Sequence, residues 1–172
     1  MHQIKQILLP TDFSDCAEPA TALALDLAQT FAARLIVLSV YNAPLYFGAL
    51  GELYLVPAEI VERLRSEVEG LLAQLRERAA ARGIPALTQA VEGIAHEKIL
   101  EVARGQGIDL IVMGTHGRTG LRHLLLGSTA ERVVRTAPCP VLTLRPPAAT
   151  SEQPAQESGS APGAPVRPSV AA

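Results

Sequence analysis

Short apolar runs alternate with segments of helical pattern along residues 1–145, and this alternation constrains the fold more than any other feature of the chain. The apolar runs are residues 4–9, 35–40, 86–91, 110–113 and 141–144, each of a length that suits a buried strand. Between them, apolar residues recur at helical spacing over 17–33, between Pro57 and Gly83, and over 97–106 and 129–136. Strands that are apolar on both faces and joined by helices are typical of a covered parallel sheet. The pattern therefore predicts an α/β fold, a five-stranded parallel sheet with helices on both faces.

The composition changes after Arg145. Residues 146–172 consist mainly of Pro, Ala and Ser, and only Val166 and Val170 are sizeable apolar residues. Such a segment cannot bury enough surface to offset the entropy of ordering it. We therefore expect a folded domain over 1–145 and a disordered tail over 146–172, with a short peptide-docking motif in the tail as the alternative.

The charge balance and the cysteines narrow the class of protein. The chain has 15 basic and 17 acidic residues, no Trp and 3% aromatic residues, which does not favour nucleic acid as a partner. Its apolar runs are far shorter than the ~20 residues of a membrane span, and the N-terminus lacks the pattern of a signal peptide. Cys16 and Cys139 have the spacing of neither a disulfide scaffold nor a metal site. We expect a cytoplasmic protein that binds neither nucleic acid nor membranes.

A glycine-rich segment follows the fourth apolar run. Gly114 and Gly117 allow a sharp turn and a close approach of the backbone to a ligand. Ser128 followed by Glu131 is a capping-box pattern, which predicts Ser128 as the N-cap of a helix whose free N–H groups suit a phosphate. Arg118 would add a charge-assisted contact. An ordinary strand–loop–helix connection explains the same glycines, so the loop alone leaves both readings open.

The spacing of these residues resembles a family signature. Gly114, Gly117, Gly127 and Ser128 match G-x2-G-x9-G-[S/T], which is similar to the nucleotide-binding signature of the universal stress protein family. Residues 8–14, 109–117 and 137–142 resemble further segments of that family. The resemblance covers about residues 3–145 as one copy of the domain, and the tail lies outside it. It implies a Rossmann-like nucleotide-binding α/β fold.

The resemblance also implies a set of binding residues. Asp12 matches the position near the ribose and the phosphate-bound Mg²⁺, which would make it an indirect metal contact. Val40 matches the position whose backbone recognises adenine. The residues implied to bind the cofactors ATP and Mg²⁺ are Pro10, Thr11, Asp12, Val40, Met113, Gly114, His116, Gly117, Arg118, Gly127, Ser128 and Thr129. The alternatives are that Asp12 only caps the turn and that His116 only bonds to the backbone of its loop. No residue is predicted to be catalytic.

These residues lead to a ranked set of functional hypotheses. The first is an ATP-binding stress-response or regulatory protein, a homodimeric nucleotide-dependent switch with at most slow ATP hydrolysis. The alternatives are a structural dimer of the same family without nucleotide, and an enzyme that transfers nucleotidyl or phosphoryl groups. The dimer would form through the strand at 141–144, an apolar run that we expect at a sheet edge. The apolar segment 41–56 would pack on its own domain, cover the adenine pocket or add a second dimer contact.

Overall fold

The computed structural model describes residues 3–42, 46–47, 53–54, 57–115 and 126–145. Its main sheet has five parallel strands in the spatial order β5-β2-β1-β6-β7. The strands are β1 (Gln6–Pro10), β2 (Arg34–Tyr41), β5 (Ala86–Glu92), β6 (Leu110–Gly114) and β7 (Val141–Leu144). Each lies within about two residues of a predicted strand, so the predicted fold is confirmed.

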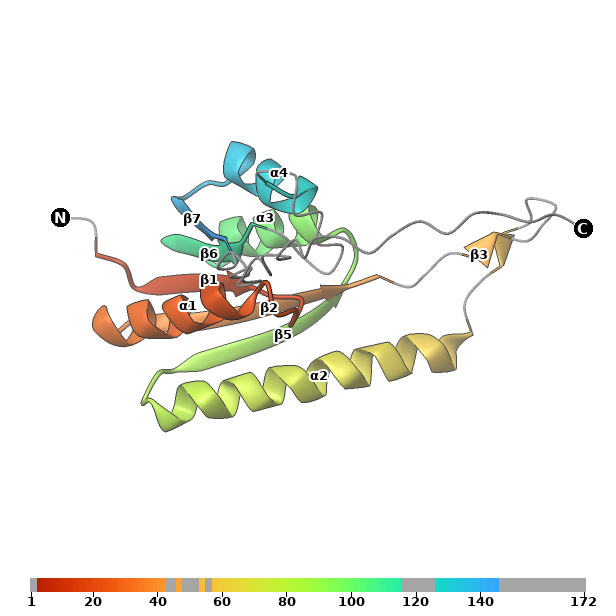
Figure 1. Ribbon diagram of the computed structural model, residues 1–172, viewed down its shortest axis with the longest axis horizontal. Helices are drawn as coiled ribbons and strands as arrows, with labels where there is room; N and C mark the ends of the chain where they lie inside the picture. Colours follow the sequence, from red (N-terminus) through yellow and green to blue (C-terminus); the bar gives the residue numbers. More distant parts are fainter. Residues whose placement is uncertain (1–2, 43–45, 48–52, 55–56, 116–125, 146–172) are drawn as a thin grey trace, which may run out of the picture.

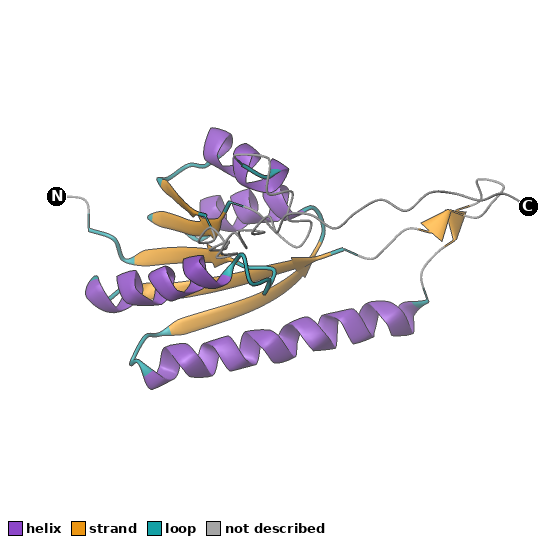
Figure 2. Cartoon of the chain, in the orientation of Figure 1, coloured by secondary structure: helices purple, strands orange, loops and turns teal. Residues whose placement is uncertain are grey.

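Four helices connect these strands and cover both faces of the sheet. They are α1 (Glu18–Thr30), α2 (Ala58–Ala81), α3 (Ala95–Gly105) and α4 (Ser128–Thr136). Helices α1 and α2 lie on one face, and α3 and α4 lie on the other (Figures 1 and 2). The reason is the order of the strands. The chain winds from β1 outward to β5, then crosses to β6 and winds the other way, and right-handed crossovers place the two pairs of helices on opposite faces.

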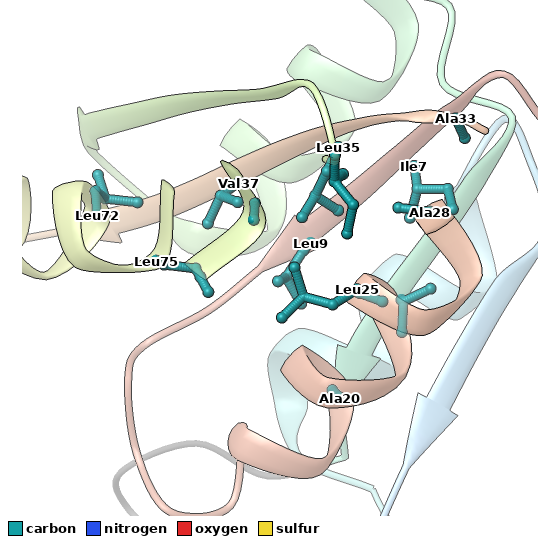
Figure 3. Close-up of a cluster of buried hydrophobic side chains, with 14 residues drawn as sticks. Ile7, Leu9, Ala20, Leu25, Ala28, Ala33, Leu35, Val37, Leu72 and Leu75 are labelled. Carbon is teal, nitrogen blue, oxygen red and sulfur yellow. The ribbon is translucent and has the colours of Figure 1, made fainter. Parts of the chain in front are cut away.

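The core consists of two apolar clusters, one on each face of the sheet. Alternate residues of β1 point to opposite faces, so Ile7 and Leu9 belong to the cluster beneath α1 and α2, whereas Leu8 belongs to the other. Figure 3 shows the first cluster, in which Leu25 of α1 and Leu75 of α2 meet the strands. The central residues of β1, β2 and β6 are fully buried. This burial on both sides explains why these segments are continuously apolar.

The limits of the helices follow local signals. Helix α1 begins at Glu18, so Pro19 falls in its first turn, where a proline removes no hydrogen bond from the helix. Helix α2 begins directly after Pro57. It ends two residues before Gly83, whose φ of +72° suits glycine.

The edges of the sheet differ from its centre. β5 and β7 are the edge strands, as predicted for 141–144, and both are partly exposed. The sequence analysis did not anticipate a second, antiparallel pair formed by β3 (Tyr46–Phe47) and β4 (Leu53–Tyr54). The rest of the apolar segment 43–56 lies outside the described residues, as does the predicted tail. Among the described helices, none combines the length and apolarity that crossing a membrane requires.

Candidate functional site

The candidate site lies where the winding direction of the sheet reverses. β1 and β6 are neighbours, but the chain leaves them toward opposite faces, which opens a crevice beyond their carboxyl ends. A cavity of about 220 Å³ lies there. Its walls come from the ends of β1, β2 and β6, the start of α1 and the N-terminal turns of α3 and α4.

Most of the predicted binding residues line this one cavity. They are Pro10, Thr11, Asp12, Val40, Met113, Gly114, Gly127, Ser128 and Thr129. The predicted residues His116, Gly117 and Arg118 lie outside the described part of the chain. The cavity therefore brings together residues from separate segments of the chain, with Pro10 and Thr129 119 positions apart in the sequence.

Other residues of the wall were missed by the sequence analysis. They are Ala17, Leu38, Ala95, Ile99, Thr115 and Ala130. Most are small or apolar, and their side chains carry no chemical signal that would separate them from the core. Thr115 had the clearest signal, because it stands between the predicted Gly114 and His116.

The turn after β1 is held by its own side chains. The Phe13 N–H donates to Thr11 Oγ1 at 3.1 Å. The Ser14 N–H and hydroxyl both donate to Asp12 Oδ1, at 3.1 and 2.7 Å. Phe13 has a φ of +58°, a conformation that few residues other than glycine adopt. Asp12 therefore has the turn-capping role that the sequence left open, and it also lines the cavity.

The start of α4 differs from the prediction at Ser128. Gly127, not Ser128, is the N-cap, with φ −72° and ψ 155°, and its carbonyl accepts the Glu131 N–H at 2.9 Å. Ser128 is thus the first helical residue, and no side chain caps the helix. The Glu131 carboxylate binds Arg135 Nη2 at 2.7 Å instead of reaching back to the cap. The prediction of a capping box was therefore wrong.

This start leaves backbone donors at the cavity. Glu131 donates the first hydrogen bond inside α4, so the N–H groups of Ser128, Thr129 and Ala130 have no partner within the helix. All three residues line the cavity. Unpaired N–H groups and the positive end of the helix dipole together favour an anion at this position. The backbone donors that the predicted anion site requires are therefore present without the predicted cap.

Two backbone hydrogen bonds close the base of the loop between β6 and α4. The Gly127 N–H donates to the Thr115 carbonyl at 2.8 Å, and the Thr115 N–H donates to the Leu144 carbonyl at 2.8 Å. The start of α4 is thereby tied to the ends of β6 and β7. The position of the free N–H groups of α4 consequently depends on the sheet and not on the loop alone.

Asp12 is the ionisable residue among the described lining residues. The described part of the chain holds no group of three or more His, Cys, Asp or Glu side chains that could bind a metal ion. A single carboxylate beside a helix N-terminus fits Mg²⁺ that is held chiefly by the phosphates of a ligand. In that arrangement Asp12 would contact the hydrated ion, and the α4 backbone would contact the phosphate.

The fold and the crevice define an open α/β protein of the doubly wound class. Proteins of this class bind their ligands beyond the carboxyl ends of the strands. Within this class, the sequence model of the Universal stress protein family matches residues 3–145. The chain therefore belongs to the universal stress protein family.

Individual relatives agree with this assignment. "Universal stress protein MJ0531" of Methanocaldococcus jannaschii is 37% identical over 148 residues, which cover 83% of this chain and 83% of the relative. The structure of UspA from Lactobacillus plantarum has a TM-score of 0.72 at 28% identity and covers 84% of this chain and 100% of its own. A universal stress protein solved in complex with cAMP has a TM-score of 0.61 at 23% identity, and the match covers 84% of this chain and 98% of that protein's chain.

Proposed function

We propose that residues 3–145 bind ATP in the cavity beyond β1 and β6, with Mg²⁺ on its phosphates. The protein acts as a homodimeric stress-response or regulatory switch, with at most slow hydrolysis of the nucleotide. The observation that carries this proposal is the convergence of Asp12, Thr115 and the uncapped start of α4 on one cavity at the switch point of the sheet.

Each part of the cavity suits one part of the nucleotide. The N–H groups of Ser128, Thr129 and Ala130 would bind a phosphate, and Asp12 would orient the metal ion that neutralises it. Leu38, Val40 and Ile99 provide an apolar wall for the adenine ring. The cAMP complex of a protein with the same fold supports an adenine nucleotide as the ligand.

A ligand search on the purified protein tests the proposal directly. The protein is purified without added nucleotide and denatured, and any released ligand is identified by mass spectrometry. ATP at a hundredfold excess over its Kd should stabilise the fold by ~2.7 kcal/mol, or roughly 5–10 °C in melting temperature. If no nucleotide is released and millimolar ATP causes no shift, the chain is a structural member of the family.

Asp12→Asn separates the metal contact from the turn. Asparagine can still accept the hydrogen bonds from Ser14 through Oδ1, but it lacks the charge that attracts Mg²⁺. We expect calorimetry to show about tenfold weaker binding of ATP with Mg²⁺, equal to ~1.4 kcal/mol, and a much smaller change in EDTA. The control is Asp15→Asn, an exposed carboxylate near the same turn. An equal loss with and without Mg²⁺ would contradict the metal role.

A further inference from the structure

A second cavity lies on the other side of the turn that follows β1. It has a volume of about 200 Å³ and is walled by the turn, the start of α1 and the middle of α2. Its lining residues are Thr11, Phe13, Ser14, Ala17, Glu18, Thr21, Leu71, Gln74, Leu75 and Arg78. Thr11 and Ala17 also line the first cavity, so the turn is a wall shared by both.

The second cavity has one positive and one negative group at its edge. Arg78 of α2 donates to Glu18 of α1 through Nη2 at 2.7 Å and through Nη1 at 3.4 Å. The two side chains are 49% and 56% exposed, so the pair lies at the mouth of the cavity and not in its interior. Phe13, Leu71 and the buried Leu75 supply the apolar part of the lining.

This arrangement selects for the charge pattern of a ligand. A simple anion that approached Arg78 would meet the like charge of Glu18, and a simple cation would meet Arg78. A zwitterion can pair with both groups, and a half-exposed ion pair opens at little cost because it is worth only about 0–1 kcal/mol. We propose that the second cavity binds a small zwitterion with an aliphatic end, the chemistry of a branched-chain amino acid. Its carboxylate pairs with Arg78, its ammonium with Glu18, and its aliphatic end contacts Leu71 and Leu75.

Occupancy of this cavity is linked to the first one through Ser14. Ser14 is one of the residues that line the second cavity, and its N–H and hydroxyl both donate to Oδ1 of Asp12, which lines the first cavity. A ligand that accepts the Ser14 hydroxyl removes one of these donors and changes how Asp12 is held. This link rests on the proposed function, because its effect on ATP requires that ATP binds beside Asp12. Any such coupling is reciprocal between the two ligands.

Calorimetry with L-leucine tests the site itself, in the absence of nucleotide. The full-length protein is titrated with L-leucine, with 4-methylpentanoate, which lacks the ammonium group, and with 3-methylbutylamine, which lacks the carboxylate. Arg78→Gln is compared with Arg82→Gln, because Arg82 also joins α2 to α1, through Asp26 at 2.5 Å, but does not line the cavity. We expect leucine to bind the wild type and Arg82→Gln with a Kd of about 1 mM or less.

Arg78→Gln should bind leucine at least about tenfold more weakly than the wild type does. The wild type should bind each of the two analogues at least about tenfold more weakly than it binds leucine. The proposal is overturned if about 10 mM leucine gives no binding to the wild type. It is also overturned if either analogue binds as tightly as leucine, or if Arg82→Gln loses as much affinity as Arg78→Gln.

The link to the first cavity has its own readouts. Saturating leucine should change the Kd of ATP by roughly fivefold or more in the wild type, and should leave it unchanged in Ser14→Ala. The backbone amide signals of Asp12 and Ser14 in NMR should shift during the leucine titration without nucleotide. Failure of ATP to bind would therefore count against the proposed function, whereas unshifted Asp12 and Ser14 amides would overturn the link.

Discussion

At the scale of single residues, Asp12 caps the turn after β1 and also lines the first cavity, so the turn-capping role does not exclude the predicted contact with a ligand. Its Oδ1 atom accepts both hydrogen bonds from Ser14, and its side chain is part of the cavity wall. The turn it stabilises holds Phe13 at a positive φ, which costs free energy that local hydrogen bonds must offset. The same interactions that shape the turn therefore hold the Asp12 carboxylate in place at the edge of the first cavity.

Gly127 offers a test of the anion site. Its φ of −72° is open to any residue, so glycine is not required there for backbone conformation, contrary to what a glycine signature suggests. Gly127→Val should keep the fold but reduce ATP affinity by more than about tenfold, because Gly127 lines the cavity next to Ser128 and a branched side chain there would crowd the phosphate. Calorimetry and thermal melting measure the two effects. Gly70→Val is the control. Gly70 lies on α2, and a Cβ there would meet nothing within 4 Å. Wild-type affinity in a folded Gly127→Val would restrict the loop to a structural role.

Cys139 provides a pH-dependent prediction. Burial raises the pKa of the Cys139 thiol above its ordinary value of 9.0, and the nearby Asp109 carboxylate raises it further. Iodoacetamide should therefore alkylate folded Cys16→Ser protein more slowly than the same protein in urea, as measured by mass spectrometry. Above pH 9 the unfolded thiol loses its proton first, so this group lowers the stability as the pH rises. Equal rates of alkylation would show that the thiol is not protected.

At the scale of elements, the strands of one sheet contribute unequally to stability. Leu8 at the centre of β1 is fully buried, whereas Leu87 on the edge strand β5 is 45% exposed. Leu8→Ala should lower the free energy of unfolding by ~2–5 kcal/mol, and Leu87→Ala by less than about 1 kcal/mol. Urea denaturation followed by circular dichroism measures both. Similar losses in the two variants would contradict the assignment of β1 as the core of the sheet.

At the scale of the whole molecule, the edge strand β7 is the proposed dimer surface. Within the described part of the chain it has a strand partner on one side only, and Leu142 on β7 and Val134 on α4 are large exposed apolar residues. Two copies related by a two-fold axis can pair these strands antiparallel. We expect the wild type to sediment as a dimer at about 50 µM and Leu142→Lys to sediment as a monomer. Leu87→Lys on the opposite edge is the control, and loss of the dimer in that variant as well would place the interface elsewhere.

The boundary of the folded domain is also a property of the whole chain. We propose that the domain ends near Arg145 and that residues 146–172 contribute nothing to its stability, because that segment has almost no apolar residues to bury. Truncation after Arg145 should leave the melting temperature and the ATP affinity unchanged, as measured by calorimetry. A lower melting temperature would mean that the tail docks on the domain.

The sequence alone determined the elements and their class. Continuous apolar runs such as 35–40 and the prolines and glycines between elements are local signals, because burial on both faces and backbone conformation act over a few residues. The strands, the helices and the edge position of β7 could therefore be predicted. The glycine spacing and Asp12 identified much of the candidate site through a family resemblance.

Only the tertiary structure decided which residues share a cavity. Ala95 and Ile99 look like ordinary helix residues in the sequence, and they reach the first cavity because α3 packs over the end of β2. Gly127, and not Ser128, is the N-cap of α4, and its N–H donates to the carbonyl of Thr115 at the end of β6. The second cavity lies between α1 and α2, which cover the same face of the sheet and bring Glu18 to Arg78, 60 residues apart. Such contacts are set by how whole elements pack, and no local pattern of residues encodes them.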